Sequence, residues 1–310
     1  MPRSRVVLAL AALAVLLSGC SAHDMEKHLR FGWPTGVTKQ GTEMRVLWTW
    51  SGVAALALGV VVWGLIFWCC IRYRKKDDTL PRQFKYNLLI EGICVFFPFV
   101  VIAVLFWRTV VVEDDVNKLS APGKADVYVQ VDAFKWNWQF EYHDFHGSPT
   151  VYPAGDPQAN QPLSTVGSDT EIPVLVLPVN QSVQIDEHSY DVIHAFWVPE
   201  FLFKRDVIPY GTTSTTRDNK FEITATSTGA FVGRCAELCG TYHSQMNFEV
   251  RVVSEADFQA YIDALKSIPS NNPNRQALAL EKAATPGGSV ATTTIPFITD
   301  RTVRSATQGG

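Results

Sequence analysis

The sequence predicts an α+β membrane protein, in which a hairpin of two transmembrane helices precedes an exported β-sandwich or β-barrel. Two long apolar stretches, residues 46–71 and 88–112, are separated by a short basic loop. Beyond residue 113, short stretches alternate apolar and polar residues, as half-buried strands do, between Pro, Gly and Asn turns. The 310 residues leave room for one membrane module and one globular domain.

The first 20 residues have the pattern of a targeting segment. Two arginines precede an apolar run that is too short to cross a bilayer. The run ends in Leu17-Ser-Gly-Cys20, which is similar to a bacterial lipoprotein box. We expect residues 1–20 to be a lipoprotein signal peptide, cleaved before Cys20 so that this thiol carries lipid. An ordinary signal peptide with a chance cysteine is the alternative. Residues 21–45 would form an exported lead-in.

The charges of the loop between the two apolar stretches predict the topology. Loops rich in Lys and Arg stay on the cytoplasmic side of a membrane. We therefore expect a multi-pass protein of a bacterial plasma (inner) membrane, with both termini exported and residues 46–112 as the hairpin. The basic residues of the loop are Arg72, Arg74, Lys75, Lys76, Arg82 and Lys85.

Glu91 stands near the start of the second apolar stretch. A carboxylate at the edge of a transmembrane helix is costly, and so it is a candidate functional residue. The alternative is an interfacial acid whose side chain reaches the headgroups. Pro98, seven residues later, is expected to kink the helix.

The exported part, predicted as a domain at 113–267, is acidic. From Glu113 onward the chain has 14 basic and 24 acidic residues. Such a surface disfavours nucleic acid and suits a basic or dipolar partner. Residues 268–310, rich in Ser, Thr, Asn, Pro, Ala and Gly, are expected to form a flexible tail.

Six strands and one helix are predicted in the exported domain. Ser254 caps the helix, which runs to about Ser267. The aromatic residues of 136–142 recur at every second position and favour a buried sheet face. The strands are expected at 127–133, 136–142, 174–179, 183–186, 221–226 and 248–253.

A candidate metal site lies in Cys235-Ala-Glu-Leu-Cys239-Gly-Thr-Tyr-His243-Ser-Gln-Met246, with His194 upstream. Thiolate, thioether and imidazole ligands suit copper and suit calcium or magnesium poorly. Two thiolates could bridge two copper ions, each with one His, while Met246 and a backbone carbonyl serve as weak ligands. An early His and a late Cys-His-Met loop favour a cupredoxin-like β domain. The alternative is a Cys235–Cys239 disulfide on an exported loop.

The spacing Cys-x-Glu-x-Cys-Gly-x-x-His-x-x-Met, preceded by Asp191-Val-Ile-His194, resembles the dinuclear copper (CuA) motif of the cytochrome c oxidase subunit II family. The resemblance implies that Glu237 binds copper through its main-chain carbonyl and, through its side chain, holds a magnesium ion shared with subunit I. The side chains that it implies as copper ligands are His194, Cys235, Cys239, His243 and Met246.

Two further segments resemble the same family. Glu91-Gly-Ile-Cys-Val-Phe-Phe-Pro98 resembles the start of its second helix, where the glutamate marks the mouth of a proton path into subunit I. Lys135-Trp136-Asn-Trp138 resembles its tryptophan-rich segment, which implies that Trp136 receives electrons from the donor. The tyrosine usual between the two tryptophans is Asn137 here.

The resemblance implies subunit II of a cytochrome c oxidase, in a complex with subunits I and III. Electrons would pass from cytochrome c to the copper pair and then to haem in subunit I, where reduction of oxygen to water is coupled to proton pumping. One alternative is subunit II of a quinol oxidase, which lacks the copper ligands. Another is a membrane-anchored copper chaperone or thiol oxidoreductase, which leaves His194 and Met246 unexplained.

The identity of the donor is left open by departures from the family pattern. Asp144 and Asp191 match acidic positions that dock a basic soluble cytochrome c, but Tyr190, His146 and Gly147 stand where further acids are common. The polar insertion 147–173 is longer than in many members. We expect it to meet a membrane-tethered cytochrome c, such as one of a quinol–cytochrome c reductase. A variable surface loop is the alternative.

Overall fold

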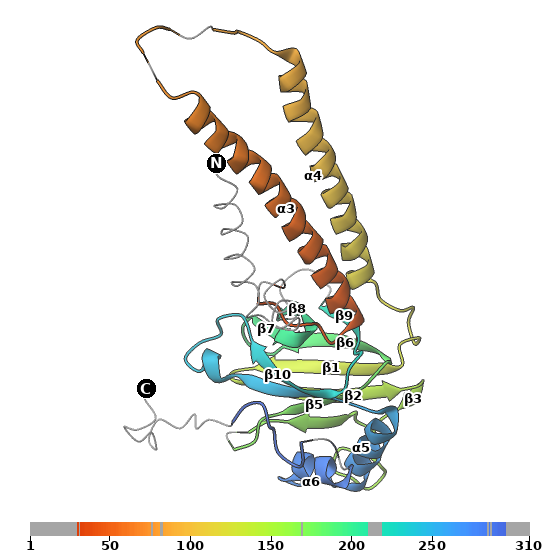
Figure 1. The fold of residues 1–310 in the computed structure, drawn as a ribbon. Helices are drawn as coiled ribbons and strands as arrows, with labels where there is room; N and C mark the ends of the chain where they lie inside the picture. Colours follow the sequence, from red (N-terminus) through yellow and green to blue (C-terminus); the bar gives the residue numbers. More distant parts are fainter. Residues whose placement is uncertain are drawn as a thin grey trace, which may run out of the picture. The chain divides into compact units, whose positions relative to one another are not determined.

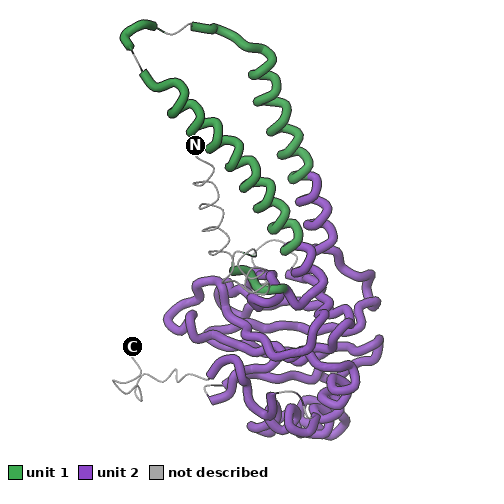
Figure 2. Tube along the Cα trace, viewed as in Figure 1, with its two compact units in different colours: residues 1–35, 45–106 green, residues 36–44, 107–310 purple. Residues whose placement is uncertain are grey.

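The computed structural model describes residues 30, 32–75, 77–80, 83–168, 170–209, 219–283, 285 and 287–295. Cys20 and the expected signal peptide lie outside the described residues. The chain divides into two compact units, residues 1–35 with 45–106 and residues 36–44 with 107–310 (Figure 2).

Two long helices, α3 (Lys39–Arg72) and α4 (Leu88–Asn117), are long and apolar enough to cross a membrane. Their apolar side chains are largely exposed in the isolated chain, as expected of surfaces that meet lipid or other subunits. Pro98 lies inside α4, and the helix continues on both sides of it. Both helices run beyond the predicted spans 46–71 and 88–112.

The exported domain consists of two β-sheets that pack around one core (Figure 1). One sheet has the strand order β3-β2-β1-β6-β9, with β4 paired to β2, and the other has the order β5-β11-β10-β7-β8. The pairs β1–β6 and β5–β11 are parallel. The strands are β1 (Val127–Phe134), β2 (Asn137–Phe145), β3 (Ser148–Pro149), β4 (Leu163–Val166), β5 (Val174–Pro178), β6 (Ser182–Ser189), β7 (His194–Val198), β8 (Phe203–Val207), β9 (Lys220–Thr224), β10 (Gly229–Cys235) and β11 (Asn247–Val253).

The aromatic stripe of β2 forms part of the core, as predicted. Trp138, Phe140 and Tyr142 point inward and are fully buried, and the residues between them face outward. Helix α5 (Glu255–Ser267) begins where the sequence predicts, because the Ser254 side chain accepts the backbone N–H of Asp257.

The expectation of a flexible tail over 268–310 is wrong for its described part. Helix α6 (Arg275–Lys282) packs against α5. The Arg275 side chain donates to the backbone carbonyls of Ser164, Leu265 and Ile268. Ala279 and Leu280 of α6 are also buried in the core, and the contacts of Arg275 add polar bonds between distant residues that composition does not reveal.

Residue 285 and residues 287–293, here called the C-terminal strap, lie against β11. Glu249 and Arg251 form a buried ion pair with Nε–Oε1 at 2.7 Å. The guanidinium also donates to the strap at Thr285 Oγ1 and at two backbone carbonyls. The other oxygen of Glu249 accepts backbone N–H groups of Thr292 (2.6 Å) and Thr293 (2.8 Å). The pair therefore holds the strap to the sheet.

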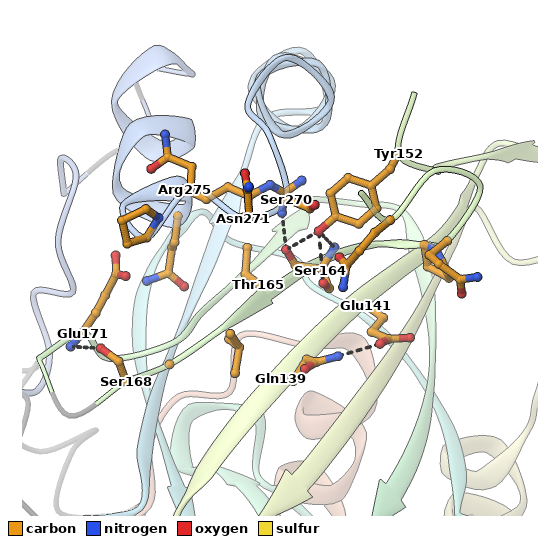
Figure 3. Close-up of a pocket in the computed structure, with 18 residues that line it drawn as sticks. Gln139, Glu141, Tyr152, Ser164, Thr165, Ser168, Glu171, Ser270, Asn271 and Arg275 are labelled. Atoms are coloured by element: carbon orange, nitrogen blue, oxygen red, sulfur yellow. Dashed lines mark hydrogen bonds between the residues drawn. The ribbon is translucent and has the colours of Figure 1, made fainter. Parts of the chain in front are cut away.

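The insertion 147–173 is folded in its described part rather than a loose loop. It contains β3 and β4, and its Tyr152 and Leu163 are buried in the core. Together with the chain between α5 and α6 it lines a polar cavity of about 520 Å³ (Figure 3). The cavity lining includes Gln139, Glu141, Ser168, Glu171 and Asn271.

The end of the lead-in, residues 36–44, packs on the β domain. Thr38 is buried and bridges to Ala225. Gly41 lies against a short 3-10 turn, Pro199–Phe201, so closely that a Cβ there would stand 2.4 Å from the Phe201 carbonyl oxygen. The lead-in therefore anchors the start of α3 to the β domain.

Candidate metal centre

Strand pairing brings together His194 and Cys235, which are 41 positions apart in the chain. β7 starts at His194 and β10 ends at Cys235, and these antiparallel strands are neighbours. The loop 236–246 then leaves β10 and returns as β11. The backbone N–H of Cys235 donates to the carbonyl of Met246 (3.0 Å), so the two ends of the loop meet.

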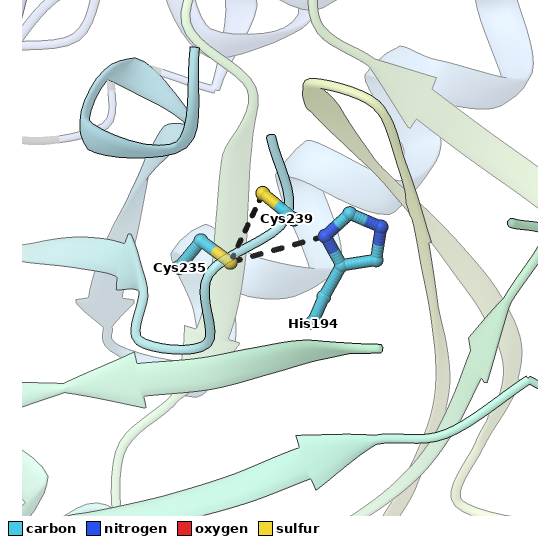
Figure 4. A group of neighbouring side chains, drawn as sticks. All are labelled: His194, Cys235 and Cys239. Atoms are coloured by element: carbon cyan, nitrogen blue, oxygen red, sulfur yellow. Dashed lines mark hydrogen bonds between the residues drawn. The ribbon is translucent and has the colours of Figure 1, made fainter. Parts of the chain in front are cut away.

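The sulfur and nitrogen atoms converge on a small buried volume (Figure 4). The Sγ atoms of Cys235 and Cys239 are 3.8 Å apart. His194 Nδ1 lies 3.8 Å from Cys235 Sγ, and His243 Nδ1 lies 3.6 Å from Cys239 Sγ. Each imidazole therefore faces a different sulfur.

Two weaker donors lie on opposite sides of the sulfur pair. The carbonyl oxygen of Glu237 is 3.2 Å from Cys235 Sγ, and the thioether sulfur of Met246 is 3.8 Å from Cys239 Sγ. The cysteines are free, and 3.8 Å is far beyond a disulfide bond of about 2.05 Å. The disulfide alternative is therefore not the arrangement in the structure.

Asp191 orients the upstream imidazole. Its Oδ1 accepts a hydrogen bond from His194 Nε2 (2.8 Å), and its Oδ2 accepts the backbone N–H of Lys135 (2.8 Å). Burial alone would lower the pKa of His194, but the Cys235 sulfur and the Asp191 carboxylate outweigh it and raise that pKa. With Nε2 committed to Asp191, Nδ1 is the nitrogen available to a metal.

The two thiols of the site differ in pKa. A hydrogen bond with Cys239 lowers the pKa of Cys235 to about 3, against the opposing effect of burial and with help from His194. The same hydrogen bond, together with burial, raises the pKa of Cys239. One thiolate is thus present near neutral pH, and a bound cation would favour loss of the second proton.

The Trp136 ring lies on the loop 236–246, here called the metal loop. Its indole N–H donates to the carbonyl of Cys239 (3.3 Å), and its ring meets that of Tyr242 edge-on with centroids 4.9 Å apart. The sequence motif identified Trp136 but not Tyr242. The signal that could have pointed to Tyr242 is its position directly before His243.

The remaining predicted residues differ in their surroundings. Glu91 lies in the other unit, where its Oε1 accepts the backbone N–H of Asn87 (3.1 Å) while Asn87 Oδ1 accepts that of Ile90 (3.2 Å). This is a reciprocal cap of helix α4. Asp144 accepts the Gly147 N–H (2.7 Å) at a hairpin turn, so it also has a local structural role.

The donor set fits copper on chemical grounds. Two sulfurs, two imidazole nitrogens, a thioether and one carbonyl are soft or borderline ligands, apart from the carbonyl. His194, Cys239 and Met246 are almost completely buried, which limits access of water. The fold and this site define a membrane-anchored protein with an exported cupredoxin-like domain that is built to hold a soft metal.

Comparison with known proteins agrees with this class. Residues 127–253 match the family model described as cytochrome C oxidase subunit II, periplasmic domain. The chain is 46% identical to a probable cytochrome c oxidase subunit 2 of Nocardia farcinica, covering 98% of this chain and 90% of the relative. It is 41% identical to cytochrome c oxidase subunit 2 of Mycobacterium tuberculosis, covering 94% and 88%. The crystal structure of the periplasmic domain of subunit II of the Bradyrhizobium japonicum cytochrome oxidase is 29% identical, with a TM-score of 0.35 over 46% of this chain and 96% of that chain.

The chain belongs to the cytochrome c oxidase subunit II family. It is thus a component of a haem–copper oxidase and works together with other subunits of that complex. The expected family and fold class are confirmed.

Proposed function

We propose that this chain holds the dinuclear copper centre of its oxidase and receives electrons there from a cytochrome c. The observation that carries the proposal is the pairing of each imidazole with a different sulfur of a close thiol pair. Glu237 would contribute its carbonyl. The side-chain ligands would be His194, Cys235, Cys239, His243 and Met246.

When bound, a thiolate-bridged copper pair supplies a site that takes up and releases one electron. The chain's own residues prepare that site. Asp191 holds His194 so that Nδ1 faces Cys235, and buried aromatic rings behind the loop limit its movement. A copper ligand that moves little between two oxidation states costs little reorganisation, which suits electron transfer.

Trp136 is proposed as the residue that accepts the electron from the donor. Its ring touches the loop at Cys239, so a route for the electron through the indole leads directly to a residue proposed as a copper ligand. The donor, a cytochrome c, loses one electron and the centre gains one.

The insertion 147–173 is proposed to contact a membrane-tethered donor. Its strand β4 pairs with β2, and the backbone N–H of Gly167 donates to the Trp138 carbonyl (3.2 Å). The insertion thus borders the chain that follows Trp136. Deleting it would remove the buried Tyr152 and Leu163, so a surface change is the better test.

Val166, about half exposed at the end of β4, offers that change. Val166→Glu should lower electron transfer from a tethered cytochrome c more than from a soluble one. Val290→Glu, on the strap, is the matched control because Val290 is also apolar and exposed. An unchanged ratio between the two donors in the Val166 variant would remove the hypothesis.

Four further assignments rest on the family resemblance. Glu91 would load protons from the cytoplasm, since its carboxylate is exposed in the isolated chain. The side chain of Glu237 would help subunit I to hold magnesium. Cys20 would carry lipid. Oxidase subunits I and III, in a bacterial plasma membrane with both chain termini exported, would surround the helices.

Copper analysis of the purified oxidase tests the central proposal. We expect two copper ions in this chain beyond those of the other subunits, and their loss in Cys235→Ser. Ser270→Ala is the control for copper lost during purification, because Ser270 is far from the site in sequence and is not a proposed ligand. One copper ion, or a reversible Cys235–Cys239 disulfide, would favour the chaperone or thiol oxidoreductase. A complete absence of this copper would favour the quinol oxidase.

A further inference from the structure

The indole of Trp136 contacts the metal loop at three residues. Its N–H donates to the Cys239 carbonyl, at a rather long 3.3 Å. Gly240 has a φ of 120°, and a Cβ there would come within 3.3 Å of the indole Cζ2. Tyr242 meets the indole edge-on, at an interplanar angle of 84°. The contacts at Cys239 and Gly240 involve backbone atoms, so Tyr242 is the residue of these three whose side chain contacts the indole.

Tyr242 is itself held firmly. It is 4% exposed, although the neighbouring residue on each side is more open to solvent. Its carbonyl accepts the backbone N–H of Gln245 (2.9 Å). The next residue, His243, has its Nδ1 3.6 Å from Cys239 Sγ. The ring that meets Trp136 is therefore fixed to the same turn that carries a proposed ligand.

We propose that Tyr242 is a positioning residue, whose ring keeps the Trp136 indole on the metal loop in the orientation that couples the donor to the centre. The inference deepens the proposed role of Trp136 and rests on it. Among its described contacts with the loop, the indole would keep one long hydrogen bond and the approach to Gly240, beside its packing against the core.

The size of the expected effect follows from aromatic pairing. An edge-to-face pair contributes enough to change the population of the contact arrangement by about twofold to tenfold. The transfer from the donor should slow by up to the same factor, because its rate is proportional to the fraction of molecules in the contact arrangement. The step itself moves one electron from donor to centre, with no bond made or broken.

The test compares Tyr242→Leu, which removes the aromatic edge, with Tyr242→Phe, which keeps it, in the purified oxidase. Stopped-flow absorbance of the copper centre would follow its reduction by a soluble basic cytochrome c and, separately, by dithionite, a small reductant that does not need Trp136. We expect the leucine variant to be slower with cytochrome c only. The phenylalanine variant should match the wild type with both reductants.

A second measurement does not depend on turnover. Hydroxyl-radical footprinting with peptide mass spectrometry reports how accessible the Trp136 ring is in the assembled oxidase. We expect about twofold or more labelling of Trp136 in Tyr242→Leu, and wild-type labelling in Tyr242→Phe. In a double-mutant cycle, Tyr242→Leu should add no further slowing to Trp136→Phe.

Several outcomes would overturn the inference. Unchanged labelling of Trp136, equal slowing with both reductants, or a phenylalanine variant as slow as the leucine variant would each exclude a positioning role for the ring edge. If Trp136→Phe alone accepts electrons at the wild-type rate, the proposed role of Trp136 fails first. If that variant is slow while Tyr242→Leu is normal, only the inference about Tyr242 fails.

Discussion

Asp191 and His194 are joined by a hydrogen bond of 2.8 Å between Oδ1 and Nε2. The other carboxylate oxygen of Asp191 accepts the backbone N–H of Lys135, the residue before Trp136. One acid therefore links a proposed copper ligand to the segment that carries the proposed electron acceptor. This double role makes Asp191 more than an acidic docking residue, which is how the sequence pattern presented it.

Asp191→Ala should weaken copper binding. The fully buried His194 would lose the acceptor that fixes its ring, and loss of such an outer partner typically lowers metal affinity by about 10- to 100-fold. Copper retention would be measured in the purified oxidase against a competing chelator. Asp263→Asn, on α5, is the control. Equal retention in the two variants would show that His194 needs no orienting carboxylate.

Glu249→Gln should release the C-terminal strap. Breaking a buried ion pair by removing one partner costs about 3–5 kcal/mol, which corresponds to roughly 10 °C in the midpoint of thermal unfolding for a domain of this size. The midpoint would be read from the loss of copper absorbance on heating. Glu281→Gln, at an exposed position on α6, is the control.

The Glu249 variant should also change the pH dependence of stability. Burial would raise the pKa of Glu249, but the hydrogen bonds from Arg251, Thr292 and Thr293 outweigh it and lower that pKa. An acid with a lowered pKa stabilises the fold above its unfolded value of about 4.3, and this contribution is lost as the pH falls through the folded value. The wild type should therefore lose its advantage over the variant in acid. A constant difference down to low pH would contradict this account.

Glu187→Gln should stabilise the domain at neutral pH. The side chain is fully buried in β6, and neither carboxylate oxygen has a hydrogen-bond partner among the described residues. Burial raises the pKa of Glu187 well above its usual range. Such an acid destabilises the fold once the pH exceeds its unfolded pKa of about 4.3.

Removing the charge should therefore raise the free energy of unfolding at pH 7. The gain should shrink as the pH is lowered toward 4. The same heating experiment, repeated across pH, measures it. A variant that is less stable than the wild type at every pH would show that the carboxylate has a stabilising partner.

Gly41→Ala should loosen the contact between the lead-in and the β domain. Its Cβ would stand 2.4 Å from a backbone carbonyl oxygen, and overpacking of this kind costs about 1–3 kcal/mol. Gly59→Ala, in the same helix, serves as the control, because its Cβ would meet no atom of another described segment within 4 Å. Protease cleavage near residue 38 should increase in the first variant only. Equal cleavage of the Gly41 and Gly59 variants would mean that the backbone at Phe201 can shift at little cost in free energy.

The residues proposed as copper ligands could be singled out from the sequence because most of them form a dense local pattern, and β1, β2 and α5 could be predicted because apolar alternation and a Ser cap are local signals. Strands β7, β8 and β10 were not predicted. β10 contains two glycines, and β8 has Lys204, Arg205 and Asp206 in sequence, so neither shows a clear alternation of apolar and polar residues. The strap and α6 depend on buried polar bonds between distant residues, such as Glu249 with Thr293. Periodicity carries no information about such bonds.

The strap has a consequence for how the domain matures during export. Glu249 lies three residues after Met246, yet the backbone partners of its second carboxylate oxygen are Thr292 and Thr293, more than 40 positions later. The strand that leaves the metal loop is thus fully secured only when almost the whole polypeptide has crossed the membrane. A truncation before residue 285 would remove these partners, so the strand that follows the loop 236–246 would lose its bonds to the strap.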